Sequence, residues 1–300
     1  MWSEIKDQKE TMELGNDKDW ENFSEGLGLG IKNKKELVFY NSNLYINSAT
    51  DIAQYIFPDN FLVTLFGELH DQEWICNSPN MSISKYIKNR VENNGENIKI
   101  ILEYNPGLRE EDILKIGSHG IRNTYTELKN INKLDKIYPY DSRPFFLTPE
   151  LNTKLYNGIE FLQFTKKYIF DTYISVFFQK SNEFEIKEPD FINPYLFSIL
   201  ISIRKQIELF FINITPHLDT LPITIIREEL KQVWQKICDW FVLKELYTKN
   251  NITEYIFIGG QYHYNYIGKE LLNTGTMNLI DVRNGNKDKC INLYHTYQFK

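Results

Sequence analysis

The segment "FLVTLFGELHDQEW", residues 61–74, contains the clearest strand pattern of this chain. It opens with a predominantly apolar run that is rich in β-forming residues, which is typical of a strand buried on both faces. The run ends at Gly67, and three acidic residues and a histidine follow within six positions. We therefore expect a central strand whose end brings ionisable groups, among them His70, to the edge of a sheet.

Other segments repeat this strand pattern further along the chain. The runs "IKIILEY" (98–104) and "EYIFIGG" (254–260) predict two more buried strands, and "KIYPYDSRP" (136–144) contains the end of a shorter one. Helical patterns over 82–93 and 109–132 separate the first three strands. This alternation predicts an α/β fold with a central, mostly parallel sheet flanked by helices.

The segments before and after these strands predict a mixture of strands and helices. Residues 36–46 predict two short strands around an Asn-Ser-Asn turn, and "SATDIAQYIFP" (48–58) predicts a capped helix that Pro58 stops. Near the other end of the chain, residues 264–273 predict a helix and 277–282 a strand.

The domain organisation follows from the same patterns. Residues 1–34 are polar and are expected to form an N-terminal extension, and 35–300 are expected to form a single α/β domain. Residues 148–250 change character, with long helical patterns over about 190–214 and 222–248. We interpret this region as a largely helical insertion in that domain.

Composition excludes several classes of protein. The formal charge of −6 and the absence of a basic block argue against a nucleic-acid partner. The longest apolar stretch, 195–203, is far shorter than the roughly 20 residues that a membrane span needs. The cysteines Cys76, Cys238 and Cys290 are isolated, which argues against a disulfide framework or a zinc–thiolate site.

The same features bear on location. The polar N-terminal residues lack the apolar core of a signal peptide, and the cysteine usage suits a reducing compartment. The abundance of Asn, Ile and Lys is typical of an AT-rich genome, such as that of a large DNA virus or a protozoan. We expect a cytoplasmic, intracellular protein, located in the host cytoplasm or a virion if the genome is viral.

Two matching motifs follow two of the predicted strands. Gly67 precedes His70 by three residues, and Gly260 precedes His263 by the same spacing. A glycine at these positions permits a sharp turn and leaves space for a ligand or a neighbouring chain. Glu103 ends another strand. Because ligands bind outside the carboxyl ends of parallel strands, we expect both histidines and Glu103 to meet at one edge.

Additional ionisable residues flank these positions. Asp141 and Arg143 lie at the strand end predicted within 136–144, and we expect them at the same edge as the histidines, although they could equally form a surface ion pair of little energetic value. Glu68 lies either at the site or in solvent, and Asp71 is interpreted as a partner that orients His70.

These residue types support two kinds of chemistry. Two imidazoles and a carboxylate suit a divalent metal with an open position, which lowers the pKa of a bound water. Without a metal, the same groups can act as a general base with an orienting carboxylate, while Arg143 stabilises an oxyanion. Tyr262, beside His263, is expected to line the ligand site, and a role as a haem ligand is a less favoured alternative.

The sequences "LFGELHD", "IILEY", "DSR" and "FIGGQYH" resemble the Tiki/TraB/ChaN/erythromycin-esterase superfamily. That group is marked by two Gly-x-x-His motifs, a glutamate after the second strand and an arginine between the motifs. The Gly-Glu-x-His-Asp form of the first motif is most similar to the ChaN-like branch. The resemblance covers about 61–144 and 254–282.

The resemblance implies roles for individual residues. It implies that His70, Glu103 and His263 bind a metal or act in catalysis, with Glu68 alongside His70, and that Arg143 is the family's arginine. The superfamily includes metal-dependent peptidases, metal-independent esterases and haem-binding proteins. The resemblance therefore indicates which residues form the site, but it does not indicate one particular reaction.

Together these observations favour a hydrolase that acts on an ester or amide bond of a small molecule or peptide. The expected cofactor, if there is one, is a divalent ion such as zinc, manganese or cobalt, and haem is less favoured. The alternatives are a haem-binding or small-molecule-binding protein, or a structural or virion protein with an inherited site. His119 is expected to be exposed on a loop, and His217 and His295 are interpreted as non-functional.

Overall fold

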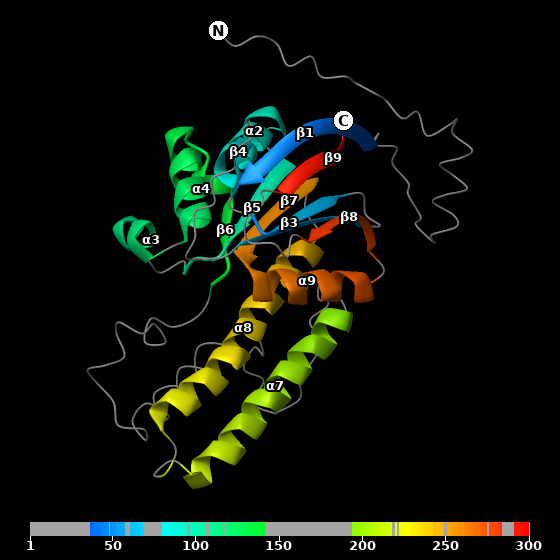
Figure 1. Cartoon of the computed structure of the whole chain (residues 1–300). Coiled ribbons are helices and arrows are strands. Elements are labelled where there is room, and N and C mark those ends of the chain that lie inside the picture. The colour runs from blue at the N-terminus through cyan, green and yellow to red at the C-terminus, as the bar shows by residue number, and fades with distance from the viewer. Residues whose placement is uncertain are drawn as a thin grey trace. The chain divides into compact units, whose positions relative to one another are not determined.

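The central strand forms where the opening stretch predicts it. β3 (Leu62–Glu68) is buried along its whole length. It pairs in parallel with β7 (Glu254–Gly260), which is also fully buried. β7 pairs in parallel with β5 (Ile98–Leu102), and β5 pairs in parallel with the short β6 (Ile137–Pro139). This confirms the predicted α/β fold with a central, mostly parallel sheet (Figure 1).

The computed structural model describes only part of the chain. The described residues are 37–47, 49–57, 61–68, 80–94, 97–105, 109–116, 118–141, 194–217, 220, 222–248, 251–274, 276–283 and 291–299. The predicted N-terminal extension over residues 1–34 lies outside them.

Two antiparallel strands complete the sheet beside β3. β2 (Asp51–Ile56) pairs with β3 on one side and with β8 (Met277–Arg283) on the other, which gives the order β6-β5-β7-β3-β2-β8. The helix predicted over 48–58 is therefore wrong. All six residues of β2 are buried, and such a short, continuously buried segment lacks the period-2 pattern that would mark it as a strand.

A second, three-stranded sheet has the order β4-β1-β9. β1 (Leu37–Asn47) pairs in parallel with β4 (Asn80–Ser82) and antiparallel with β9 (Ile291–Phe299). The two strands predicted over 36–46 are thus one long strand. The Asn-Ser-Asn segment produces a shift in the β1–β9 register, between residues 41 and 44, instead of a turn.

Helices cover both faces of the six-stranded sheet. α2 (Ile83–Asn94) and α4 (His119–Asn130), with α3 (Glu110–Ile116) between them in sequence, lie on one side, and α9 (Gln261–Asn273) lies on the other (Figure 1). The core beneath α2 and α4 is built from alternate residues of the strands together with the inward residues of both helices: Phe66, Ile100, Leu102, Ile256, Ile258, Ile87, Val91, Ile121 and Leu128. This alternation follows from the two-residue period of a strand.

A buried ion pair holds α2 to the amino end of β7. Arg90 donates from Nε to Glu254 Oε1 at 3.1 Å and from Nη2 to Oε2 at 2.5 Å, and both residues are buried. Tyr86 lies near this pair, and burial raises the pKa of its phenol to about 12. The pair lies at the opposite end of β7 from the motif residues.

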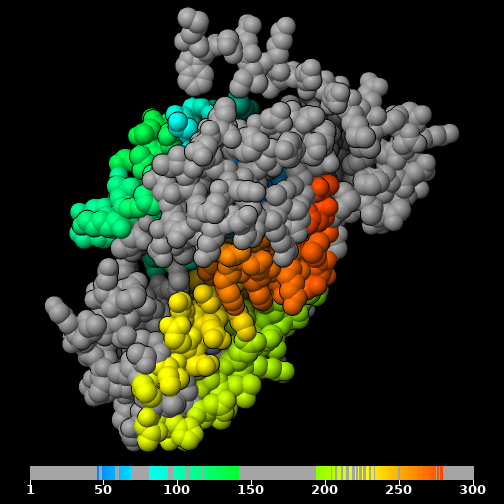
Figure 2. Space-filling view, viewed as in Figure 1, coloured from blue at the N-terminus to red at the C-terminus, as the bar shows by residue number. Residues whose placement is uncertain are grey.

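The chain divides into two compact units, and the second comprises Ser142–Lys249. Its described part contains α7 (Pro194–Ile214), the 3-10 helix η5 (Thr215–His217) and α8 (Ile223–Tyr247), with α7 and α8 labelled in Figure 1. Figure 2 draws the atoms of α7 in yellow-green and those of α8 in yellow. α7 and α8 pack together, and Trp240 Nε1 donates a hydrogen bond to the Leu196 carbonyl at 2.9 Å. The helices agree with those expected in the insertion predicted over 148–250, whereas its description as an insertion within one domain stays a prediction.

None of the helices in the described ranges is long and apolar enough to cross a membrane.

Candidate functional site

The carboxyl ends of β3, β5 and β7 lie side by side, and the helices that follow these strands in sequence cover opposite faces of the sheet. α2 follows β3 and α4 follows β5 on one face, whereas β7 leads directly into α9 on the other face. Such a change of face between neighbouring parallel strands marks the position where open α/β sheets bind ligands. The two Gly-x-x-His motifs start on adjacent strands there, because Glu68 pairs with Gly260 in the β3–β7 register.

Glu103 and His263 form a buried pair at this edge. His263 Nε2 lies 3.3 Å from Glu103 Oε1, and their side chains are 3% and 4% exposed, respectively. The other carboxylate oxygen of Glu103 accepts a hydrogen bond from the backbone N–H of Gly260 at 2.8 Å. Two of the three predicted metal or catalytic residues are therefore in contact.

His263 lies in the first turn of α9. The helix was predicted over 264–273, but it begins at Gln261, directly after Gly260. The first turn of α9 carries no acidic residue of its own, so Glu103 supplies the negative charge that favours a helix N-terminus. Gly260 has φ −58° and ψ 155°, which any residue can adopt, so the sharp turn expected at this glycine is not found.

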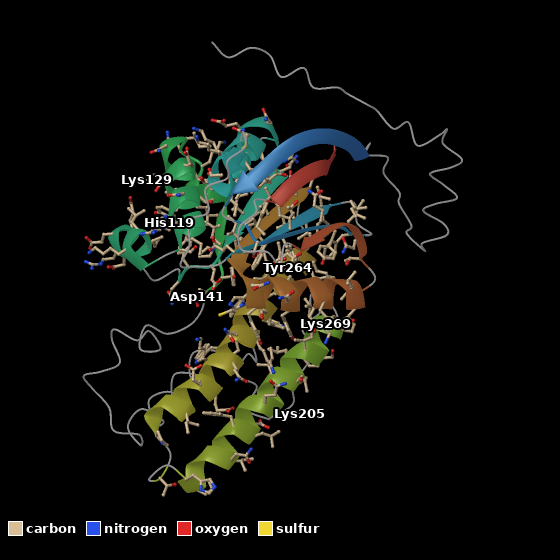
Figure 3. The ribbon with its side chains drawn as sticks, in the orientation of Figure 1. His119, Lys129, Asp141, Lys205, Tyr264 and Lys269 are labelled. Atoms are coloured by element: carbon tan, nitrogen blue, oxygen red, sulfur yellow. The ribbon has the colours of Figure 1, made fainter. Side chains whose placement is uncertain are left out.

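Close packing against α9 explains why the first motif has a glycine at position 67. A Cβ atom on Gly67 would lie 3.2 Å from Cγ of Tyr264, a residue of α9 labelled in Figure 3. Gly259 is similarly confined, because a Cβ there would collide with the hydroxyl of Tyr140 and lie 2.5 Å from a ring carbon of Phe257. These glycines let α9 and the end of β6 approach the strands closely.

Aromatic rings enclose His263. The ring of Tyr140 meets its imidazole edge to face at a centroid distance of 5.7 Å, and the ring of Tyr262 does so at 5.6 Å. Tyr140 is buried, whereas Tyr262 is 44% exposed. Tyr262 therefore lies between the buried pair and the surface, a position compatible with its predicted role in lining a ligand site.

Glu68 is buried but faces α4. Its Oε1 atom accepts a hydrogen bond from Ser118, whose hydroxyl also accepts from the Ile121 N–H and caps α4. Its Oε2 atom lies against Gly120, where a Cβ would collide with it. Ser118 was not among the predicted site residues, because it lies inside the single helical pattern predicted over 109–132, whereas the structure has α3 and α4 as separate helices. His119, expected to be exposed on a loop, is instead the first residue of α4 and is partly buried.

Asp51 is a further buried carboxylate at this edge, and sequence reasoning missed it. β2 runs antiparallel to β3, so its first residue lies beside Gly67 at the carboxyl end of β3. Asp51 Oδ2 accepts hydrogen bonds from Gln261 Nε2 at 3.1 Å and from Thr50 Oγ1 at 2.9 Å. Because residues 48–58 were expected to be a helix, no pattern placed Asp51 here.

The other predicted positions are only partly described. Asp141 is partly buried where the chain leaves β6 (Figure 3), and its N–H donates to the Tyr104 carbonyl at 3.2 Å. His70, Asp71 and Arg143 lie outside the described residues. Among the residues that the structure describes, no three His, Cys, Asp or Glu side chains are grouped as a metal site would require.

Tyr104 follows Glu103 in sequence, but its ring packs against the core that contains α2 and α4. Burial, and then the neighbouring Tyr125, raise the pKa of Tyr104 to about 12. The two tyrosine rings meet edge to face at 6.0 Å. Tyr104 therefore remains protonated at neutral pH and can donate a hydrogen bond, but it cannot act there as a phenolate nucleophile.

Comparisons with protein-family models, with curated proteins and with solved structures find no match to this chain.

Proposed function

We propose that this protein is a hydrolase of an ester or amide bond whose site is built around Glu103 and His263. The observation that supports this most strongly is the buried carboxylate–imidazole pair at the carboxyl edge of the parallel strands, where the direction of the chain changes. Burying both groups costs free energy unless they interact. The low dielectric of the buried site also strengthens the electrostatic interaction between them.

Glu103 sets the protonation of the imidazole. With its carboxylate beside Nε2, the neutral ring carries its proton on Nε2, and Nδ1 then holds the basic lone pair. A water molecule activated at Nδ1 would attack the substrate carbonyl, and the resulting imidazolium would be stabilised by Glu103. The Gly260 N–H holds the carboxylate in place through its second oxygen.

His70 and Arg143 complete the proposed site. They belong to it through the sequence motifs and through the resemblance to the Tiki/TraB/ChaN/erythromycin-esterase superfamily. His70 follows β3 by two residues, and β3 is the direct neighbour of the strand that leads to His263. Arg143 would bind the oxyanion that forms when water attacks.

The donor set also fits a divalent metal. Carboxylate oxygens and imidazole nitrogens are both ligands that zinc binds in proteins. Glu103 Oε1 and His263 Nε2 lie 3.3 Å apart, so these two donor atoms are close enough to bind the same ion. Glu103, His263 and His70 would hold such an ion, which would lower the pKa of a bound water.

A substrate screen tests the proposal. Purified protein would be assayed against panels of activated esters, amides and short peptides, beside variants His263→Asn and Glu103→Gln. His217→Ala is the matched control, because His217 is an exposed histidine of η5 in the second unit. We expect turnover in the wild type and control and a loss of at least about 100-fold in both site variants. Equal turnover in His263→Asn and the wild type would refute the proposal.

Elemental analysis separates the two versions of the mechanism. Stoichiometric zinc, manganese or cobalt in the wild type, lost in His263→Asn and retained in His217→Ala, would indicate the metal-assisted version. Turnover that persists after exhaustive dialysis against a chelator would instead indicate the general-base version.

A further inference from the structure

Two residues outside both motifs connect the motifs to each other. Thr50 donates its backbone N–H to the Gly67 carbonyl at 2.8 Å, and its hydroxyl lies 3.1 Å from the same carbonyl oxygen and 2.9 Å from Asp51 Oδ2. Asp51 Oδ2 in turn accepts a hydrogen bond from Gln261 Nε2 at 3.1 Å. Gly67 belongs to the first Gly-x-x-His motif, and Gln261 lies inside the second.

We propose that Thr50 and Asp51 are positioning residues that hold the first turn of α9, and with it His263, against the end of β3. The catalytic part of this assignment rests on the proposed function, because Thr50 and Asp51 would affect turnover only through the position of His263 and need not contact substrate. The hydrogen bonds are themselves independent of any reaction.

The first turn of α9 is held from two sides. Glu103, after β5, binds the Gly260 N–H, and Asp51, at the start of β2, binds the Gln261 side chain. The helix has no side-chain N-cap of its own. Both contacts come from buried carboxylates, which accept hydrogen bonds more strongly than neutral oxygens do. His263 follows Gln261 by two residues, so a shift of this turn moves the imidazole relative to Glu103.

A buried carboxylate is a costly way to join two strands and a helix if only stability is required. Asp51 is 3% exposed, and a carboxylate loses much more hydration free energy on burial than an amide does. Its position opposite Gly67 in the β2–β3 register places the charge beside the site and away from the centre of the sheet. This location suits a residue that positions the first turn of α9 and, with it, His263.

Amide hydrogen exchange tests this inference without a substrate. The Gly260 N–H is the reporter, because its partner is Glu103, and the N–H groups of Ile256 and Ile258 in the same strand are the internal references. We expect Asp51→Ala to raise exchange at Gly260 at least about tenfold more than at the two references. Asp51→Asn should raise it less, because its carbonyl oxygen can still accept from Gln261.

Glu254→Gln is the matched control. Glu254 lies at the other end of β7, and this change weakens the buried pair with Arg90 while leaving Asp51 in place. It should lower global stability without preferential exchange at Gly260. If Asp51→Ala does not fold, Thr50→Val removes the hydroxyl with little change in shape, and Thr50→Ser restores it. Equal acceleration at Gly260, Ile256 and Ile258 in these variants would overturn the positioning role.

Kinetics then separates this inference from the proposed function. With a substrate in hand, Asp51→Ala should lower kcat by about tenfold or more with little change in KM, and Asp51→Asn should restore part of it. Unchanged kcat despite faster Gly260 exchange would overturn the positioning role. If the wild type hydrolyses nothing, the proposed function fails, and the exchange data still decide whether Thr50 and Asp51 hold the turn.

Discussion

Replacing Glu103 separates its contribution to folding from its contribution to chemistry. In Glu103→Ala, the Gly260 N–H and His263 Nε2 both lose a buried charged partner. Removing one member of a buried pair costs about 3–5 kcal/mol of unfolding free energy. For a compact unit of 150–250 residues, such as the one that contains Glu103 (Met1–Asp141 and Asn250–Lys300), 1 kcal/mol corresponds to roughly 2–4 °C, so Tm should fall by about 6–20 °C.

Glu103→Gln should behave differently, because it keeps the shape and one acceptor. Its carbonyl oxygen can still accept from the Gly260 N–H, so the loss should be about 1–2 kcal/mol, or roughly 2–8 °C in Tm. That orientation turns the amide NH₂ toward Nε2 of His263. Nε2 must then accept a hydrogen bond, and the ring proton moves to Nδ1, where the basic lone pair was.

Two assays measure these effects. Urea titration and calorimetry give the free energy and Tm of each variant, and nitrogen NMR of the His263 side chain reports which ring nitrogen carries the proton. We expect Glu103→Gln to fold with the proton on Nδ1 and to lose turnover by at least about 100-fold. A Glu103→Gln protein with the wild-type tautomer and wild-type turnover would show that Glu103 does not set the tautomer for catalysis, and a loss under about 1 kcal/mol in Glu103→Ala would show that it does not stabilise the fold.

Three further predictions follow from buried contacts elsewhere in the sheet. Arg90→Ala should lower the free energy of unfolding by about 3–5 kcal/mol, because Glu254 is left buried without its bidentate partner. A urea titration in which the unfolding free energy falls by under about 1 kcal/mol would contradict this. Gly259→Ala should cost about 1–3 kcal/mol by the same measurement, because the new methyl group collides with the Tyr140 hydroxyl, and a neutral result would contradict the close packing. Tyr86 should ionise near pH 12, which phenolate absorbance can follow by comparison with Tyr86→Phe. Because folding raises its pKa, its contribution to the free energy of unfolding is complete below pH 10 and is lost as the pH rises to 12. Ionisation near pH 10 would contradict its burial.

The parallel core of the sheet could be predicted because its strands are buried on both faces. "FLVTLF" and "EYIFIGG" are nearly continuous apolar runs, and they became β3 and β7. Their adjacency could not be read from the sequence, since β7 inserts between β3 and β5 after a separation of well over a hundred residues. Pairing at that distance is decided by the packing of side chains and helices, which no local pattern reports.

The error over 48–58 explains the residue that was missed. Ser48 before an apolar segment and Pro58 after it are typical helix boundaries, yet contacts with β3 and β8 on either side make the segment a strand. That change of structure is what brings Asp51 to the carboxyl edge. Glu103 and His263 were predicted correctly to meet because each follows a strand whose type and direction were clear.

If the residues after neighbouring strands act as one site, a double-mutant cycle on turnover should reveal their coupling. His70→Asn, His263→Asn and the double variant would be compared with the wild type by kcat/KM on one hydrolysed substrate. Residues that act as a unit are strongly non-additive, so the account predicts a double variant no slower than the slower single variant. Losses that multiply, with the double variant slower by the product of the two single effects, would show that the two histidines act independently and would contradict the account.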